Sequence, residues 1–376
     1  MREKVGTVAV VVALVLAWGG GFLWFRGDLN LPLIGARGGA ATEKTAAAAA
    51  KPTASPKAPA VTKKSPSAGA TYDGTVTPAQ ENRAVDINPH PARPAPIALP
   101  PVAEFKMATF NLLGASHTGG RGKAAGRPSG AARIGGALEL ISRHQASVVG
   151  FQEMQGSQRS AFRGRAPKWE LYPGDSLGNS GENSIGWNTD VWQLVKPAAI
   201  AIPYFGGNPR QMPYVLLRQK ATGVLAYFAN FHNPADIRKF RNQGRFRAEA
   251  KRREIELFNG LQKLGIPVFV TGDMNEREEF FCQVAGATTM IAAAGGSAVN
   301  GSCQVPRPTQ IDWILGSKDV QFADYSIDRS ELVRRTTDHP VVSARVVIDS
   351  LKFKNAYQPD AAADSVAGSA AEATTP

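Results

Sequence analysis

Pro267-Val268-Phe269-Val270-Thr271-Gly272-Asp273-Met274-Asn275 is the stretch of sequence from which the fold of this chain can be worked out. Its apolar part, bounded by Pro267 and Gly272, predicts a short buried strand. A carboxylate and a carboxamide two residues apart at the end of such a strand can face one cavity, and loops at strand ends commonly carry catalytic groups. Gly, Asp and Asn are also turn-forming residues, so this motif alone indicates either a turn or a site.

Three other predicted strands also end in polar residues. They are residues 106–110 before Asn111, 147–151 before Glu153, and 224–230 before His232. A Glu that closes an apolar strand is either a solvated cap or a site carboxylate. A lone His is usually structural, but a His that closes a buried strand, in a chain with five His, is a better site candidate.

The segments between these strands complete the expected elements. Residues 134–144 place Ile134, Leu138 and Ile141 on one face and predict a helix. A further strand is expected at residues 214–217. We also expect residues 181–188 to pair with residues 191–195 across an intervening turn.

The strand predicted over residues 310–315 carries a carboxylate, Asp312, in its middle. An unpaired charge in a buried strand is costly, so Asp312 needs a partner. His339, which lies just before the last predicted strand, is the natural candidate. An Asp–His pair fixes the orientation and the proton of the imidazole, as general base chemistry requires.

Seven short motifs occur in an order that resembles the endonuclease/exonuclease/phosphatase superfamily, the deoxyribonuclease I-like fold. In chain order they are Thr-Phe-Asn (109–111), Gln-Glu (152–153), Glu-Asn-Ser (182–184), Asn-Phe-His (230–232), Gly-Asp-Met-Asn (272–275), Gln-Ile-Asp-Trp (310–313) and Asp-His-Pro-Val (338–341). The resemblance covers nearly all of residues 105–347. It implies an α/β fold, a four-layered sandwich of two packed β-sheets flanked by helices, and cleavage of phosphoester bonds with Mg²⁺ or Mn²⁺.

The resemblance also implies roles for individual residues. Asn111, Glu153 and Asp338 are expected as metal ligands, with Glu153 the principal one. Hard oxygen ligands of this kind suit Mg²⁺, which keeps several waters and binds substrate phosphate as well.

The catalytic roles fall on the remaining motifs. Asp273 and Asn275 are expected to hold the attacking water and the charge of the transition state. Asp312 is expected to orient His339, which acts on the water or the phosphate.

Three further residues complete the expected site. His232 is a second His on the phosphate side, with Glu182 as a further catalytic candidate and Arg210 as a phosphate contact. The chain departs from the family pattern at Phe231-His232-Asn233, where the family usually has Thr-His-Leu.

The N-terminal residues 1–25 contain an uncharged apolar run of about 21 residues, which matches the length that spans a bilayer. We expect a transmembrane signal anchor. A cleaved signal peptide is the alternative, but its apolar core is normally shorter and no clean Ala-x-Ala site follows here. Positive charges flank the run on both sides and discriminate orientation poorly. We take the rest of the chain to lie outside the cytoplasm.

Composition divides the rest of the chain into three parts. Residues 26–104 are rich in Ala, Pro, Thr, Lys and Ser and cannot bury enough surface to offset their ordering entropy, which predicts a disordered linker. Residues 105–349 form the expected catalytic domain. Residues 350–376 are again low in complexity and predict a disordered tail.

The expected catalytic domain is basic. It has 30 Lys and Arg against 21 Asp and Glu, a net charge of +9 within the chain's formal +12. Such a surface favours polyanions such as nucleic acid or anionic lipid, although it also serves solubility. The strongest run comprises Arg238, Lys239, Arg241, Arg245, Arg247, Lys251, Arg252 and Arg253. This run is either the solvated face of a helix or a surface that follows phosphates.

The chain has two cysteines, Cys282 and Cys303. In an oxidising compartment they predict one disulfide that closes a loop of about 20 residues. Two buried free thiols are the alternative. The predicted export from the cytoplasm favours the disulfide.

We therefore expect a metal-dependent phosphodiester hydrolase with a monomeric catalytic domain, tethered to the membrane by the N-terminal helix or secreted if that helix is cleaved. The net charge favours nucleic acid, DNA or RNA, as the substrate. A phospholipid or inositol-phosphate phosphoesterase resembling sphingomyelinase is one alternative. A catalytically silent surface binding module is another, and it predicts missing site residues, whereas the expected set is present.

Overall fold

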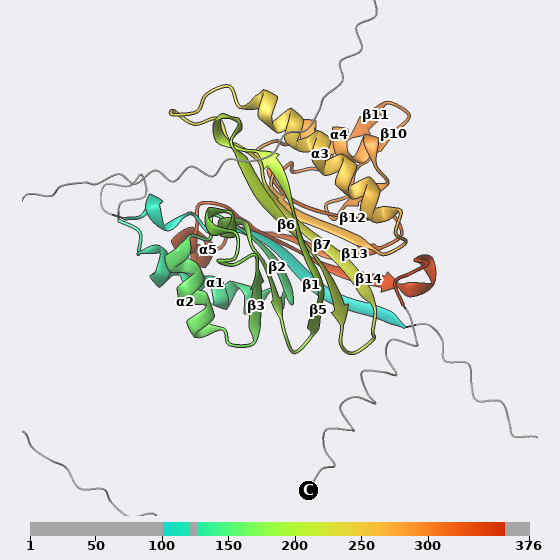
Figure 1. Cartoon of the computed structure of the whole chain (residues 1–376), viewed down its shortest axis with the longest axis horizontal. Helices are drawn as coiled ribbons and strands as arrows, with labels where there is room; N and C mark the ends of the chain where they lie inside the picture. Colours follow the sequence, from blue (N-terminus) through green and yellow to red (C-terminus); the bar gives the residue numbers. More distant parts are fainter. Residues whose placement is uncertain (1–100, 120–125, 358–376) are drawn as a thin grey trace, which may run out of the picture. The chain divides into compact units, whose positions relative to one another are not determined.

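Two six-stranded mixed β-sheets face each other in the computed structural model, which describes residues 101–119 and 126–357 (Figure 1). The first sheet has the order β13 (Gln321–Asp328), β14 (Val341–Asp349), β1 (Val102–Asn111), β2 (Val148–Gln152), β4 (Ile185–Asn188), β3 (Trp169–Tyr172). The second has the order β5 (Trp192–Pro203), β6 (Pro209–Gln219), β7 (Leu225–His232), β8 (Val268–Asp273), β12 (Asp312–Ser317), β9 (Met290–Ala292).

Helices cover the outer face of each sheet (Figure 1). The first sheet is covered by α1 (Gly130–Arg143), α2 (Gly156–Arg165) and α5 (Glu331–Thr336), and the second by α3 (Gly244–Gln262) and α4 (Glu278–Ala287). The described residues also contain four short 3-10 turns: η1 (Ala115–His117), η2 (Gly178–Asn183), η3 (Phe205–Gly207) and η4 (Ser350–Lys352). The four-layered α/β sandwich expected from the resemblance is confirmed.

Three apolar layers hold the sandwich together. The central one lies between the sheets and contains Phe105, Trp192, Phe228 and Phe269, whose rings pack at centroid distances of 5.0–5.7 Å. The outer layers join each sheet to its helices. Burial of aromatic side chains of this size is the main favourable contribution to folding.

The local signals of α1 explain why it forms and how it packs. Ser129 caps its N-terminus, because the Ser129 hydroxyl accepts a hydrogen bond from the Ala132 N–H at 3.3 Å. Ile134, Ala137 and Leu140 are fully buried against the first sheet, as the helical spacing of apolar residues predicts.

The pairing predicted between residues 181–188 and 191–195 is wrong. The strand β4 pairs with β2 and β3 in the first sheet, whereas β5 pairs with β6 in the second. The turn after Asn188 therefore carries the chain from one sheet to the other. A second correction concerns Asp312, which begins β12 instead of lying in the middle of a strand.

A disulfide joins Cys282 of α4 to Cys303 of β11 (Ser302–Gln304), which pairs with β10 (Ser297–Val299). The predicted disulfide is thus confirmed. It closes a loop with a sequence separation of 21 residues next to the outer apolar layer of the second sheet.

Removing this disulfide is expected to destabilise the fold. Closing a loop of this length restricts the conformations of the unfolded chain, and this restriction contributes about 3 kcal/mol to the free energy of unfolding. The double variant Cys282→Ser/Cys303→Ser should therefore lower the free energy of unfolding in urea by about 2–4 kcal/mol. The wild-type chain measured with reductant should match the variant. An unchanged unfolding midpoint in both would contradict the prediction.

The predictions for residues 1–25, for most of the linker at 26–104 and for the tail beyond residue 357 lie outside the described residues. Within residues 101–119 and 126–357, the structure contains no helix with the length and apolar character needed to cross a membrane.

Candidate active site

The polar side chains predicted at strand ends meet at one edge of the two sheets. Strand register explains this arrangement, because Asn111 pairs with Gln152 across β1 and β2, while Asp273 pairs with both His232 and Asp312. The ends of β1 and β2 in one sheet thus face the ends of β7 and β8 in the other. The site is built on rigid strands, and its polar groups are positioned before any substrate arrives.

His339 pairs with Asp312, as the sequence predicted. The His339 Nδ1 atom lies 3.0 and 3.1 Å from the two carboxylate oxygens of Asp312, and its Nε2 lies 3.6 Å from Asp273 Oδ2. Burial lowers the pKa of His339, but the hydrogen bond and charge of Asp312, with the charges of Asp273 and Asp338, raise it to about 10. His339 is therefore an imidazolium at neutral pH.

Asp273 lies at the centre of the site and is 2% exposed. Its Oδ2 is 3.1 Å from the Asn111 amide nitrogen and 3.6 Å from His232 Nε2, and its Oδ1 accepts the Asn275 N–H at 3.0 Å. Burial and the charge of Asp312 raise the pKa of Asp273. A buried carboxylate with a raised pKa suits proton transfer.

His232 is fixed by a residue that the sequence analysis did not single out. The hydroxyl of Tyr204, at the end of the β5–β6 hairpin, lies 3.1 Å from His232 Nδ1. The two rings are 5.5 Å apart, and both residues are buried. No local sequence signal marks Tyr204, because its contact with His232 depends on how two strands cross at the site.

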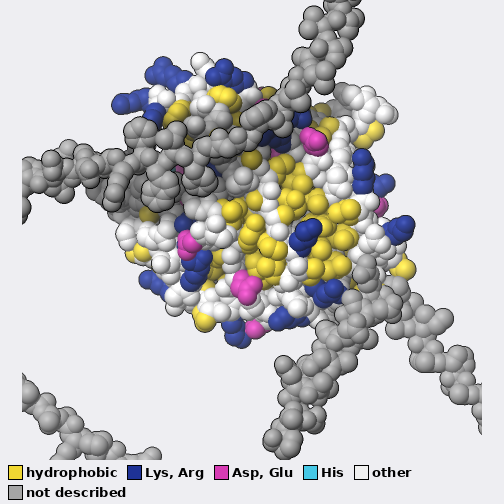
Figure 2. All heavy atoms as spheres, viewed as in Figure 1, with side chains coloured by type: hydrophobic (Ala, Val, Ile, Leu, Met, Phe, Trp, Pro, Cys, Tyr) yellow, Lys and Arg dark blue, Asp and Glu magenta, His cyan; other side chains and the backbone are white. Residues whose placement is uncertain are grey.

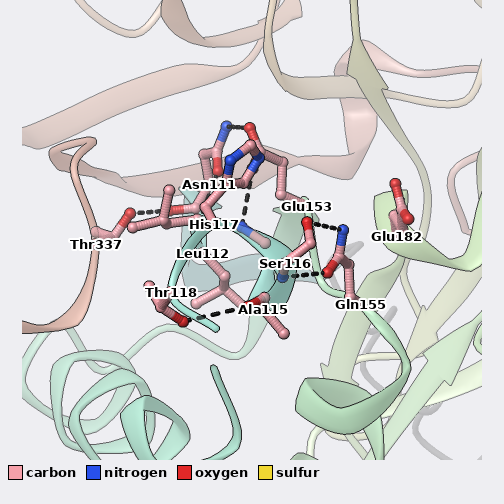
Figure 3. A network of polar contacts seen from close by, with 12 residues as sticks. Asn111, Leu112, Ala115, Ser116, His117, Thr118, Glu153, Gln155, Glu182 and Thr337 are labelled. Atoms are coloured by element: carbon pink, nitrogen blue, oxygen red, sulfur yellow. Dashed lines mark hydrogen bonds and ion pairs between the residues drawn. The ribbon is translucent and has the colours of Figure 1, made fainter. Parts of the chain in front are cut away.

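Asn111 and Glu153 form the other half of the site, and Figure 3 shows their side chains together with that of His117. The Asn111 amide donates to Glu153 at 3.1 Å, and the Gly114 N–H donates to Glu153 at 2.9 Å. His117 Nε2, also missed by the sequence analysis, lies 3.4 Å from Glu153 Oε2.

Glu153 is held ionised in an unusual backbone conformation. Burial raises its pKa, but the charge of His232, the Gly114 N–H, the Asn111 amide and His117 together lower it below the usual value. Its φ of 58° is rare for a residue with a long side chain and is typical of functional positions. This conformation turns the Glu153 side chain out of the β2 alternation and toward the site.

Asn275 is held by a second asparagine. Its amide donates to the Asn233 carbonyl at 2.8 Å, and the Asn233 N–H donates to the Asp273 carbonyl at 2.9 Å. A cavity of about 450 Å³ opens beside Asn275 and Arg247. Asn275 is thus linked to Asp273 through the Asn233 backbone, and one side of Asn275 faces a solvent-accessible cavity.

Glu254 of α3 is a fully buried carboxyl behind this asparagine pair. Burial raises its pKa to about 8, although the Asn233 side chain and the charge of Lys251 oppose the shift. In the unfolded chain the same group ionises above about pH 4.5. The unfolded state therefore loses this proton first, and stability falls as the pH rises from about 4.5 to about 8.

Replacing Glu254 by glutamine is expected to remove this pH dependence. The stability of Glu254→Gln relative to the wild type should increase by about 3 kcal/mol between pH 5 and pH 8, measured as the free energy of unfolding in urea. Glu256→Gln is the matched control, because Glu256 is on the same helix with its side chain 75% exposed. A constant difference between the wild type and Glu254→Gln across this range would contradict the buried carboxyl's role.

Asp338, Glu182 and Arg210 lie farther from the central carboxylate. Asp338 is exposed, next to His339. Arg210 Nη1 lies 3.5 Å from Glu182 and 2.7 Å from the Asn179 carbonyl, and its guanidinium carbon lies 4.9 Å from the Tyr204 ring centroid. Burial raises the pKa of Glu182, with Arg210 opposing the shift and the charge of Glu153 adding to it. Figure 3 shows Glu182 apart from the Asn111–Glu153 pair.

A second polar layer lies directly beneath the site, and the sequence analysis did not identify its role. Gln152 donates to Asn230 at 2.7 Å and to Thr109 at 3.1 Å, and Thr271 donates to Asn230 at 3.1 Å. Thr109, Asn230 and Thr271 each precede a site residue by two positions. The period of two along a strand was the available signal, since it places both residues on one face. These buried hydrogen bonds join the two sheets below the site.

The donor set fits a hard divalent cation at Glu153. Glu153 is ionised, and its side chain is 24% exposed. Asp273, Asp312 and His339 also offer ligand atoms within 4.8 Å of one another, but the carboxylates of Asp273 and Asp312 already accept hydrogen bonds from neighbouring residues. In this arrangement Asn111 presents nitrogen to Glu153, while its oxygen accepts the Leu113 N–H. Glu153 is therefore the better position for the cation, and the exposed Asp338 is the second carboxylate that the resemblance implies.

Solved structures confirm the fold. An endonuclease/exonuclease/phosphatase family protein from Bacteroides thetaiotaomicron is 18% identical, with a TM-score of 0.52 over 66% of this chain and 99% of that chain. A mannosyl-6-phosphatase from the same organism is 18% identical, with a TM-score of 0.51 over 65% and 100%. The human Nocturnin catalytic domain, with a bound sulfate anion, is 16% identical, with a TM-score of 0.51 over 65% and 94%.

Comparison with curated proteins gives no match. The model of the Endonuclease/Exonuclease/phosphatase family matches residues 108–339, which include the site from Asn111 to His339 and more than half of the chain. Enzymes of this family generally use a divalent metal, and the candidate site offers acidic and imidazole groups for one. The family match and the shared fold confirm the resemblance, and the chain belongs to the endonuclease/exonuclease/phosphatase family.

Proposed function

We propose that this chain is a divalent-metal-dependent phosphodiesterase that cleaves nucleic acid. The observation that supports it best is the convergence of His339, Asp312, Asp273 and His232 on one side of the site, opposite Glu153. This arrangement places an imidazolium and a buried carboxylate of raised pKa within one cluster. A carboxylate of raised pKa can accept a proton from water, and an imidazolium can donate a hydrogen bond to a phosphoryl oxygen.

The residues of the chain divide the chemistry between them. Asp273 accepts a proton from the attacking water as the water oxygen bonds to phosphorus. The bond between phosphorus and the leaving ester oxygen breaks, and that oxygen takes a proton from solvent. His339, protonated and oriented by Asp312, donates a hydrogen bond to a phosphoryl oxygen as negative charge grows there. His232 and Asn275 hold the phosphoryl group from the other side. A cation held by Glu153 and Asp338 would supply positive charge to the phosphoryl and leaving oxygens.

The charge of the chain favours a polyanionic substrate. The net charge of +9 over residues 105–349 supports nucleic acid over a small neutral ester. The similar solved structures include a protein named as a sugar phosphatase, so the fold alone does not choose the substrate.

We also propose that the catalytic part works outside the cytoplasm, tethered by the N-terminal apolar run. The Cys282–Cys303 disulfide supports an oxidising compartment. Protease accessibility in intact cells tests the location, because a cytoplasmic chain would be protected.

The activity test compares substrate classes directly. The full chain should nick plasmid DNA or cleave RNA with Mg²⁺ or Mn²⁺ and lose this activity in EDTA. Parallel reactions follow phosphocholine release from sphingomyelin and phosphate release from inositol phosphates. Release in these reactions without cleavage of either nucleic acid would replace the proposed substrate with a lipid or inositol phosphate.

A further inference from the structure

An ordered surface of aromatic and basic side chains lies next to the candidate site. It is formed by the η3 turn at the tip of the β5–β6 hairpin, by the loop that precedes α3 and by the first turn of α3, and we call it the aromatic–basic platform. Its members are Phe205, Phe240, Arg238, Lys239, Arg241 and Arg245. Figure 2 shows Lys and Arg side chains gathered at the upper left, where Figure 1 places the start of α3 and the loop before it.

The contacts of the platform fix its shape. The rings of Phe205 and Phe240 stack with centroids 5.3 Å apart and an interplanar angle of 23°. Gly206 has a φ of 69°, and an added Cβ there would lie 3.2 Å from the Phe240 ring. The Gly206 N–H donates to the side-chain oxygen of Gln243 at 3.0 Å, so a hydrogen bond also joins the hairpin tip to the loop.

The loop is also anchored at its base. The Gln243 N–H donates to Asp236 at 2.6 Å, and Asp236 pairs with Arg247 at 2.8 Å. Arg247 in turn pairs with Glu276 at 3.1 Å. These bonds hold the ends of the loop together, so the platform is a formed surface.

Tyr204 connects the platform to the site. Its ring packs against Phe205 at 4.5 Å, and its hydroxyl reaches His232 at 3.1 Å. Arg210 lies over the same tyrosine ring. Tyr204 thus joins His232 of the site to Phe205 of the platform, with Arg210 against the same ring.

The basic run predicted from the sequence divides into two groups. In α3, Arg252 and Arg253 both pair with Glu249. Among the described residues, the four cations of the platform form no ion pair with an acidic side chain, and all four are exposed. Lys239 lies 5.3 Å from the centroid of the Phe240 ring. The platform thus combines an aromatic surface with cations that are free to meet phosphates.

We propose that the aromatic–basic platform binds an unpaired nucleotide strand beside the phosphodiester that is cleaved. A base stacks on Phe240 in the place of the Lys239 side chain, and the platform cations contact the flanking phosphates. Stacking on an aromatic ring accepts any base, whereas a base inside a duplex has no free face. This inference rests on the proposed nuclease function and narrows its substrate to single-stranded or locally opened nucleic acid.

The experiment measures binding of the full chain to a short fluorescein-labelled oligothymidylate by anisotropy, with EDTA present to prevent cleavage. Phe240→Ala should weaken binding about tenfold and leave the salt dependence unchanged. Phe240→Leu, which keeps an apolar contact with Phe205, should weaken it similarly. The triple variant Arg238→Gln/Lys239→Gln/Arg241→Gln should reduce the slope of log affinity against log salt by about 2, since each phosphate contact on a single strand contributes about 0.7.

The matched control for charge is Lys263→Gln/Lys318→Gln/Lys352→Gln, which removes three exposed cations after α3, beyond the far end of β12 and after β14. It should leave the salt slope unchanged. Hydrolysis of bis(p-nitrophenyl) phosphate with Mn²⁺ should be unaffected in Phe240→Ala, because this small ester does not reach the platform.

The outcomes separate this inference from the proposed function. If both Phe240 variants bind the oligonucleotide as the wild type does and the small ester is still hydrolysed, the platform does not bind the strand. The proposed phosphodiesterase activity would still stand. If oligonucleotide binding depends on Phe240 but the wild type hydrolyses no phosphodiester, strand binding by the platform is supported. The proposed nuclease activity is then wrong. Weaker binding of the variants to phosphatidylserine vesicles, with unchanged binding to the oligonucleotide, would overturn the inference in favour of a membrane surface.

Discussion

His339→Ala is expected to lower the turnover number for phosphodiester hydrolysis by about 10²–10⁴-fold, the range that a positioned acid or base contributes. The imidazolium is held by Asp312 at 3.0 Å and lies 3.6 Å from Asp273, so alanine removes a fixed proton donor from the centre of the site. Asp312→Asn should show part of this loss, because the amide cannot hold the raised pKa of His339. The measurement is the turnover number on a small phosphodiester at saturating Mn²⁺.

The chain offers a matched control for this prediction. His144 also pairs with an aspartate, Asp328, at 3.0 Å, and its other ring nitrogen lies 3.0 Å from the Ser343 hydroxyl. This pair joins the end of α1 to β13 and β14 outside the site. His144→Ala removes the same atoms from an Asp–His pair and should leave turnover unchanged. Equal losses in the two variants would indicate that loss of folding, and no catalytic role, explains the result for His339.

Those site residues that lie at the ends of strands could be predicted from the sequence. Asp273 and Asn275 could be placed because an apolar run ends immediately before them, and His232 could be placed in the same way. The Asp312–His339 pair followed from the cost of an unpaired buried charge. Which strands lie side by side is set by packing between the sheets, so Tyr204 and His117 carried no local signal. The same reason explains the wrong pairing predicted for β5.

The sequence also could not decide whether the basic run at residues 238–253 is the solvated face of a helix or a surface that binds phosphates. Both α3 and the loop before it are rich in Lys and Arg. Only the structure shows that Arg252 and Arg253 are paired with Glu249, while Arg238 and Arg241 form no ion pair with a described acidic residue. Pairing depends on helical spacing, and the helix begins at Gly244, later than the start of the charge run.

Glu153→Gln is expected to have the second large effect, because it removes the charge of the residue best placed to hold a cation. Glutamine keeps the size of the side chain, and its one carbonyl oxygen can accept one of the two hydrogen bonds that Gly114 and Asn111 donate to separate oxygens of Glu153. The wild-type chain should gain thermal stability as Mn²⁺ is added, since a ligand that binds only the folded state stabilises it. In Glu153→Gln this gain should need at least about tenfold more metal, in line with the loss of one carboxylate ligand.

The activity of Glu153→Gln should fall by more than its weaker metal binding explains. The turnover number of Glu153→Gln at saturating Mn²⁺ is expected to be lower by about 10²-fold or more, because a neutral ligand leaves the cation and the phosphate differently placed. Glu182→Gln is the control, since Glu182 is a part-buried carboxylate that pairs with Arg210 apart from Glu153. Its metal titration should match that of the wild type. If the two variants titrate alike, or if Glu153→Gln binds Mn²⁺ as the wild type does, the cation is held elsewhere, and the cluster of Asp273, Asp312 and His339 becomes the position to test.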